Sequence, residues 1–301
     1  MIPAFLATAL FAVSILAAGR SARMLGSHTA NFGRVVVAVV LLAIWAHTVG
    51  QGFGGGAFAL FFLSGCIGFG LGDVALFQAL PRLGPRLSSL MINCLAAPFG
   101  AAIEWGWLGT PLSATQCVGS LVILAGVALA LAPEHHQPIP RRLWQAGIVF
   151  GVLAGLGQAL GAVISRKAYA VSAAAGGSMD GGTAAFQRIL GGLVIVAIPF
   201  LYQLYARRTR RLDPVGAPMS TATRRSAWTW VLLNGLTGPT IGVAFYQWGL
   251  KLAPSGVVLS ITATTPLLVI PFTRWLEGDR PGPRSLVGCV LAVLGVIVLT
   301  A

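Results

Sequence analysis

The sequence has few charged residues. Only 9% of its 301 residues are Asp, Glu, Lys or Arg, whereas soluble domains have about 25%. By contrast, 56% of the residues are hydrophobic and the mean hydropathy is +0.84. A water-soluble globule of this composition could not cover its surface with charge, so an ordinary soluble enzyme and a disordered chain are excluded. The composition predicts an all-α membrane protein whose surface faces lipid.

Cysteines and catalytic motifs are equally scarce. The four cysteines fall in apolar stretches and form no CxxC pair, so neither a metal site nor a disulfide framework is predicted. The chain has no GxSxG, HExxH or P-loop motif, which argues against a hydrolase and against ATP hydrolysis by this chain. We therefore expect no enzyme activity, no metal and no cofactor.

Acidic residues number only 7 against 20 Lys and Arg, which gives a net charge of +13. We expect no nucleic-acid partner, because the basic residues are scattered between apolar stretches instead of gathered in one domain. They indicate membrane orientation. Loops that follow the odd-numbered spans defined below contain 15 of these residues and the other loops contain three. This split places the first set of loops in the cytoplasm and both chain ends outside a cell (inner) membrane.

Ten apolar stretches approach the roughly 20 residues needed to cross a bilayer. They cover residues 2–19, 33–49, 57–80, 86–108, 114–132, 144–165, 184–205, 228–250, 255–275 and 285–301. A polar, proline-containing linker at 133–143 separates five spans in residues 1–132 from five in residues 144–301.

The two halves share motifs in the same order. A GxxxxxxG motif occupies 119–126 and again 288–295, and a proline and a tryptophan stand at the same separation in 98–107 and 266–275. An odd number of spans per half inverts the second half relative to the first. Inverted repeats with a cavity at their interface are characteristic of secondary transporters. The sequence therefore predicts ten transmembrane helices as two inverted five-helix repeats.

These motifs carry a resemblance to a family. The stretch GDVALFQALPRLG at 72–84, the RLSSL that follows at 86–90, Pro98 and the glycines of 119–126 are together similar to the EamA-type transporters of the drug/metabolite transporter superfamily. The resemblance covers nearly the whole chain as two EamA-like repeats. It implies a ten-helix transporter that moves small metabolites, often outward, and in several members amino acids.

Charged residues inside the spans are candidates for function, because a charge at the bilayer centre costs about 2.5–3.5 kcal/mol on insertion scales. Asp73 and Asn93 lie seven residues from the cytoplasmic ends of their spans, so both can lie at one depth. Asp73 fits a site for a proton or a cationic substrate. The alternative is a buried ion pair with Arg34, or a hydrogen bond between helices.

Two further charged residues lie near outer span ends. Glu104 could line an outer vestibule, or reach the interface between tryptophans. Arg188, which follows Gln187, could bind a substrate carboxylate through two hydrogen bonds. We favour instead a guanidinium that extends to the outer interface.

Three uncharged residues complete the candidates. Gln158 lies among small residues and could bind substrate or simply join two helices. Asn234 precedes Thr-Gly-Pro at 237–239, which should loosen its helix and expose backbone carbonyls to a cavity. Gln247, with its neighbours Tyr246 and Trp248 near the outer end of the same span, could line a pocket or sit in the aromatic belt.

We expect a secondary active transporter, an exporter, of small metabolites such as amino acids, with alternating access at the repeat interface. Its partners are a small-molecule substrate and the lipid bilayer, and the protein is expected to be a monomer. The alternatives are a flippase for lipids or lipid-linked sugars, an integral-membrane enzyme acting on lipid, and a passive channel. The enzyme would need paired acid–base or metal-binding side chains at one depth, which Asp73 and Asn93 do not provide.

Overall fold

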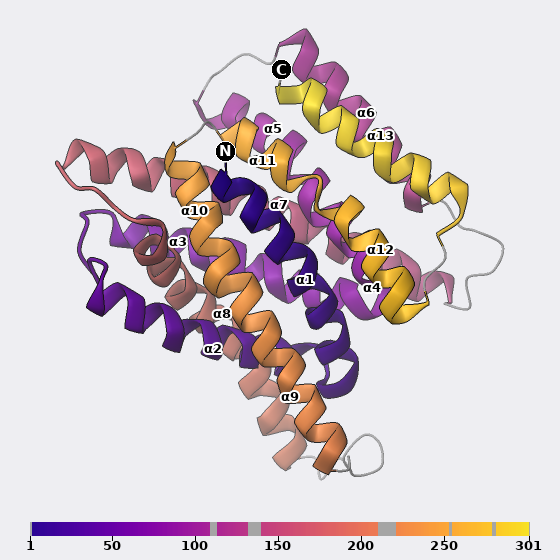
Figure 1. Cartoon of the computed structure of the whole chain (residues 1–301), viewed down its shortest axis with the longest axis horizontal. Coiled ribbons are helices and arrows are strands. Elements are labelled where there is room, and N and C mark those ends of the chain that lie inside the picture. Colours follow the sequence, from indigo (N-terminus) through magenta and orange to yellow (C-terminus); the bar gives the residue numbers. More distant parts are fainter. Residues whose placement is uncertain are drawn as a thin grey trace.

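The computed structural model describes residues 2–108, 113–131, 140–209, 221–252, 255–278 and 281–300. Within these ranges the protein consists of helices and their connections, without strands (Figure 1). Five helical stretches are long and apolar enough to cross a membrane, and two shorter helices are also apolar. The prediction of an all-α protein with several apolar spans is therefore confirmed.

The helices follow one another along the chain in two series. The first is α1 (Ile2–Leu25), α2 (Ser27–Thr48), α3 (Phe58–Gly65), η1 (Cys66–Gly72), α4 (Asp73–Cys94), α5 (Ala96–Leu108) and α6 (Ala114–Leu131). The second is α7 (Arg141–Ala174), α8 (Gly181–Thr209), α9 (Thr221–Gly235), η2 (Leu236–Gly242), α10 (Val243–Leu252), α11 (Ser255–Thr262), α12 (Thr265–Glu277) and α13 (Pro283–Thr300). Each predicted span overlaps helical residues.

Helix α4 changes direction at Gly84, where φ is 75° and ψ is 170°. This φ lies in the region that glycine adopts without steric cost. Pro85 follows directly and has no backbone N–H to continue the helical ladder. The bend falls between the predicted spans 57–80 and 86–108, so α4 contributes its first part to one and its second part to the other.

Two π-helical segments, η1 and η2, interrupt otherwise continuous helices, and each has seven residues. They occupy the third predicted span of each half, and the helices that follow them begin at Asp73 and Val243. The predicted loosening of the helix around 237–239 is therefore confirmed. A π segment leaves backbone groups outside the regular α-helical ladder and is frequent at functional sites.

Glycines at the end of α3 and in η1 allow this stretch to pack closely against α7 and α8. A Cβ built on Gly65 would lie 1.7 Å from the carbonyl oxygen of Arg188, and one on Gly157 would lie 2.7 Å from the Cα of Gly72. Neither contact is possible with a larger residue. The interpretation of the glycine-rich stretch 65–72 as a helix-packing surface, and not a phosphate loop, is confirmed.

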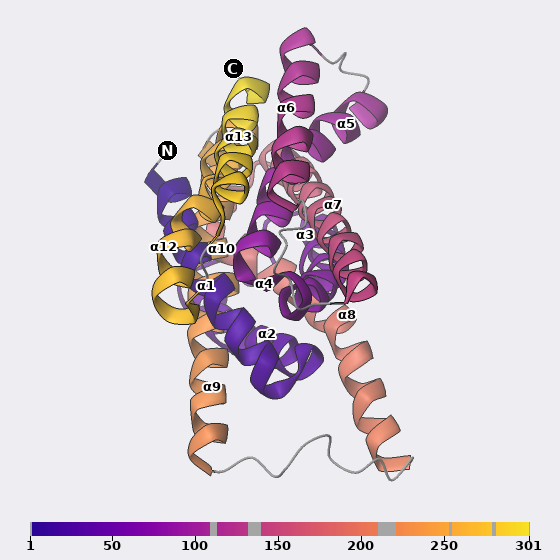
Figure 2. The ribbon, with the colours of Figure 1, turned by 90° about the vertical axis from the view of Figure 1, so that its right-hand side faces the viewer.

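The GxxxxxxG helices α6 and α13 pack against each other at one side of the molecule (Figures 1 and 2). Gly126 lies against Gly288 and Ala292, while Gly295 lies against Gly119 and Ile123. Contacts between 126 and 288 and between 119 and 295 mean that the helices run antiparallel. The prediction that these two spans sit together through their glycines is confirmed.

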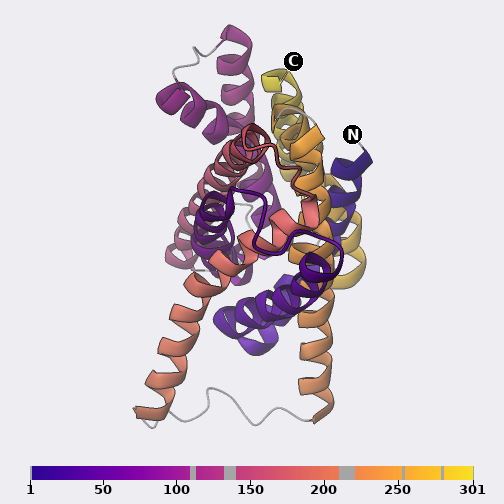
Figure 3. The same cartoon turned by 90° about the vertical axis from the view of Figure 1, so that its left-hand side faces the viewer.

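The ends of the helices divide between two faces. Helix α1 begins and α13 ends at one end of the molecule, whereas α8 ends and α9 begins at the other (Figures 2 and 3). The start of α1 and the end of α13 therefore lie on the face opposite the end of α8 and the start of α9. Which face meets the cytoplasm stays a prediction from the charges.

The charge distribution predicts that residues 206–227 are cytoplasmic. In a variant without the four native cysteines, Ser220→Cys should resist a membrane-impermeant maleimide in intact cells. Ser178→Cys, in the connection before α8, should react readily in the same cells. Strong labelling of Ser220→Cys together with protection of Ser178→Cys would reverse the orientation.

The α6–α13 contact predicts different effects of the same substitution at two glycines. Gly126→Ala should destabilise the protein by about 1–3 kcal/mol, because the added Cβ would lie 2.4 Å from the backbone nitrogen of Ala292. Gly106→Ala in α5 is the matched control, since no described atom outside its own helical turn lies within 4 Å of its added Cβ. Thermal unfolding in detergent measures both, and equal melting temperatures would contradict this packing.

Candidate functional site

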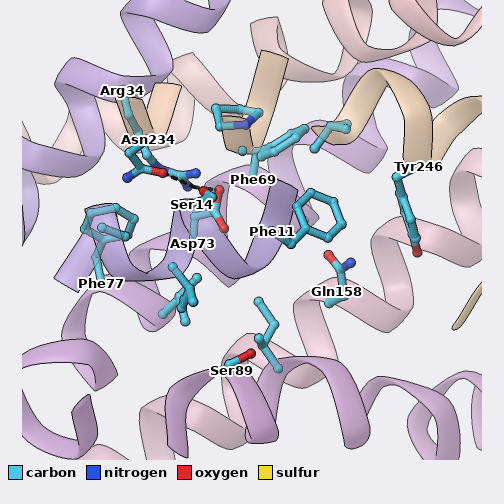
Figure 4. Close-up of a pocket in the computed structure, with 18 of the residues that line it drawn as sticks. Phe11, Ser14, Arg34, Phe69, Asp73, Phe77, Ser89, Gln158, Asn234 and Tyr246 are labelled. Carbon is cyan, nitrogen blue, oxygen red and sulfur yellow. Dashed lines mark hydrogen bonds and ion pairs between the residues drawn. The ribbon is translucent and has the colours of Figure 1, made fainter. Parts of the chain in front are cut away.

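A cavity of about 90 Å³ lies between the two halves of the chain (Figure 4). Helices α1, α2 and α4 and segment η1 line it from the first half, and α7, α8, α9, η2 and α10 line it from the second. Both π segments thus reach the same space. Aromatic and aliphatic side chains form much of the wall, with a small set of polar groups between them.

An ion pair between Arg34 and Asp73 lies at this cavity. The exposed fractions of the two side chains are only 6% and 10%. Arg34 also donates from Nε to Oδ1 of Asn31 at 3.0 Å, and its guanidinium lies 4.8 Å from the ring centroid of Phe77. Of the readings of Asp73 left open by the sequence, the ion pair with Arg34 is the one present.

Amides on α4 and α9 add hydrogen-bonding capacity to the wall. Asn93 Nδ2 donates to the carbonyl oxygen of Ser89 at 2.9 Å, and Ser14 Oγ donates to Asn234 Oδ1 at 2.8 Å. The Nδ2 atom of Asn234 is buried and has no hydrogen-bond partner among the described residues. Gln158 reaches the cavity from α7 (Figure 4).

Arg188 is the residue that the sequence placed wrongly. It does not extend to the outer interface: its exposed fraction is 3% and it lines the cavity. Helix α8 begins at Gly181, earlier than the predicted residue 184, so Arg188 lies about 10 Å along the helix from its start. At that depth the side chain turns into the protein instead of toward water.

Asp180 fixes the start of α8. Its carboxylate accepts hydrogen bonds from the backbone N–H of Thr183 at 2.9 Å and from Trp45 Nε1 at 3.0 Å. Burial alone would raise the pKa of Asp180, but these bonds and one from the Thr183 hydroxyl outweigh it and lower the pKa. Because the folded-state pKa is lowered, this helix cap is fully effective at neutral pH and weakens as the pH falls through that pKa.

Two of the eight predicted residues, Gln187 and Gln247, are not among the described residues that line the cavity. Gln187 donates from Nε2 to the carbonyl oxygens of Gly52 and Gly54 at 3.0 and 2.9 Å, so it holds the connection after α2. Gln247 is completely buried, and its amide has no partner among the described residues. The side chain of Glu104 lies outside what the structure describes.

The cavity therefore gathers five predicted residues: Asp73, Asn93, Gln158, Arg188 and Asn234. Sequence reasoning missed Ser14 and Ser89. A single serine in an apolar helix is a weak signal, because its hydroxyl often bonds a carbonyl of its own helix. Tyr246, for which the sequence left an aromatic belt or a pocket open, lines the cavity (Figure 4).

The fold and the cavity define a multi-pass helical membrane protein with a polar site between its halves. The sequence model of the EamA-like transporter family matches residues 1–132 and again 145–301. The chain therefore belongs to the EamA-like transporter family, whose members are transporters and not enzymes.

Solved structures share the fold. One crystal structure has 18% sequence identity and a TM-score of 0.63, with 99% of this chain and 94% of the other covered. At this identity the likeness extends to the fold alone. A comparison with curated proteins found no match.

The ion pair predicts a defined pattern of stability. Asp73→Asn should destabilise the protein by about 3–5 kcal/mol, because it leaves Arg34 buried without its partner. The double variant Arg34→Gln/Asp73→Asn should recover much of this loss, since it removes both charges together. Thermal unfolding in detergent measures all three proteins. A stable Asp73→Asn protein that exchanges substrate but loses only proton-driven accumulation would instead favour Asp73 as a proton site.

Proposed function

We propose that the protein is a secondary active transporter that exports small metabolites, with amino acids as the first class to test, from a cell inner membrane. The observation that carries this proposal is the central cavity, to which both halves of the chain contribute polar residues and a π segment. Substrate would bind there while the halves move to open first one face and then the other.

Structural correspondences between the halves support ten spans arranged as two inverted repeats. Segments η1 and η2 occupy equivalent places in residues 1–132 and 144–301, and Asp73 and Val243 begin the helices after them. The antiparallel contact between α6 and α13 joins the fifth span of each half with its glycines matched in reverse order. A two-fold axis in the membrane plane, predicted from the motifs, produces such a contact.

The π segments also suggest how the cavity could open. Their backbone bonds are less regular than those of α-helices, and such segments are places where a helix changes direction at low cost. Both lie at the cavity wall, η1 between the helical arms α3 and α4 and η2 between the helical arms α9 and α10. Small rotations at η1 and η2 would move these arms relative to the substrate.

A lipid flippase fits the described residues less well. An apolar groove of about 520 Å³ runs beside Leu41, Trp45, Ile241 and Phe245. It shares no lining residue with the central cavity, so a lipid headgroup in this groove would meet Asp180 and Lys251 and not the polar residues between the two halves. A lipid enzyme is also disfavoured, because Asp73 is the cavity's one lining carboxylate within the described ranges and it is paired with Arg34.

Counterflow in proteoliposomes tests transport directly. Vesicles loaded with unlabelled compound should take up the same radiolabelled compound for at least one member of a panel of amino acids, small carboxylates, amines and neutral metabolites. Ala18→Phe should reduce the initial rate at least tenfold, because Ala18 lines the cavity. Ala170→Phe is the matched control on an exposed face of α7 and should retain the wild-type rate.

Counterflow that is absent for the whole panel would overturn the transport proposal. Equal rates for the Ala18→Phe variant and its control would show that substrate does not pass through this cavity. Melting temperatures of both variants should be measured alongside, so that a loss of rate is not confused with a loss of folded protein.

A further inference from the structure

Arg188 is a buried cation that forms no ion pair within the described part of the chain, although Asp73 is near enough to interact with it electrostatically. Its guanidinium makes no hydrogen bond or ion pair with any residue in the described ranges, and its Nε atom is sealed from solvent. The contact that is present is with the ring of Phe69, whose centroid lies 5.1 Å from the guanidinium carbon. A cation at this depth is costly unless it is paired, so such groups mark substrate or ion pathways.

The surrounding helices position this guanidinium. A Cβ built on Gly68 of η1 would lie 3.0 Å from the terminal nitrogen Nη2 of Arg188, and one on Gly161 of α7 would lie 3.1 Å from it. Glycine on both neighbours leaves room for the planar group between the π segment and α7. Packing therefore fixes the orientation of the guanidinium N–H groups. A fixed planar arrangement of these donors suits two parallel hydrogen bonds to a carboxylate.

The charges of the cavity select among substrates. Arg34, Asp73 and Arg188 are the charged residues that line it, and the first two neutralise each other. The wall thus has a net charge of +1. A monoanion would neutralise it, whereas a zwitterion would leave the positive charge uncompensated and would need an acceptor for its ammonium group.

The uncharged polar atoms at the wall include further donors without partners. The Tyr246 hydroxyl and the Asn234 Nδ2 are buried and have no hydrogen-bond partner among the described residues. Asp73, which could bind an ammonium group, is already engaged by Arg34. Phe11, Ile15 and Leu76 provide an apolar wall for the rest of a small molecule.

We propose that the cargo binds through a carboxylate to Arg188 and carries a net charge of −1, so that the site selects small monocarboxylates over zwitterionic amino acids. This inference rests on the proposed transport function and, within small metabolites, favours monocarboxylates over the amino acids named above as the first class to test. A carboxylate on Arg188 would also accept a hydrogen bond from the nearby Tyr246 hydroxyl, which has no partner among the described residues.

Pyruvate and alanine provide a matched test, because they share a three-carbon skeleton and a carboxylate. They differ at the second carbon, which bears a ketone oxygen in pyruvate and an ammonium group in alanine. In counterflow, radiolabelled pyruvate should exchange at least tenfold faster than alanine, and alaninamide, a cation, should not compete.

In detergent, pyruvate and acetate should raise the melting temperature of the protein. Arg188→Gln should weaken pyruvate binding by about 10- to 100-fold, and Arg188→Lys should weaken it less.

Control variants separate binding from folding. Arg188→Gln should retain or raise the melting temperature without ligand, because the guanidinium has no hydrogen bond to lose, whereas an essential structural arginine would lower it. Arg166→Gln, at an exposed position on α7, should bind pyruvate as the wild-type protein does.

Alanine exchange as fast as pyruvate exchange, or pyruvate binding unchanged in Arg188→Gln, would overturn the inference. It would also be overturned if neither monocarboxylate stabilised the protein. Exchange of neutral or cationic panel members without any carboxylate would overturn the monoanion inference and leave transport standing. Absence of all counterflow would instead remove the transport proposal, while binding of pyruvate to Arg188 would still be decided by the melting temperatures.

Discussion

The exclusion of water from the bilayer interior is the constraint on which this structure depends. Each polar group in the spans must find its partner within the protein, because lipid offers none. Arg34 and Asp73 meet this demand through each other, Gln187 through two backbone carbonyls, and Ser14 through Asn234. Among the three charged residues that line the cavity, Arg188 is the one without an ion pair within the described residues, which directs attention to an anionic ligand.

Glycine makes the arrangement possible. Gly126 and Gly288 bring α6 and α13 together at one side, away from the cavity, while the glycines of η1 admit α7 and α8 to close contact. Helix association in lipid relies on such packing, because apolar side chains gain little by leaving one apolar medium for another. The same small residues leave room for the Arg188 guanidinium, so the packing of the helices and the charge of the site have a common cause.

The charge of the cavity also has a consequence for mechanism. A positively charged wall that is neutralised by its cargo would be more costly to bury without that cargo, and this would favour movement of the loaded form. The paired Asp73 contributes no free charge in this arrangement. If the cargo is a monoanion as proposed, exchange of one anion for another would be the simplest cycle for these side chains, and the comparison of exchange with net accumulation in vesicles distinguishes it from proton-driven export.

Composition and apolar periodicity were sufficient to predict an all-α membrane protein, the approximate position of each helical stretch, and the glycine contact between α6 and α13, because a bilayer imposes length and hydrophobicity on every span. They also marked Asp73, Asn93, Gln158 and Asn234, since polar residues are rare in such helices.

Sequence could not decide whether Asp73 was free or paired, because Arg34 lies on another helix and their contact depends on how α2 packs against α4. Nor could it decide the direction of Arg188. A guanidinium near a span end reaches water or the interior according to where its helix starts, and the cap at Asp180 that places this start is completed by Trp45 from α2, a contact that only the tertiary structure creates.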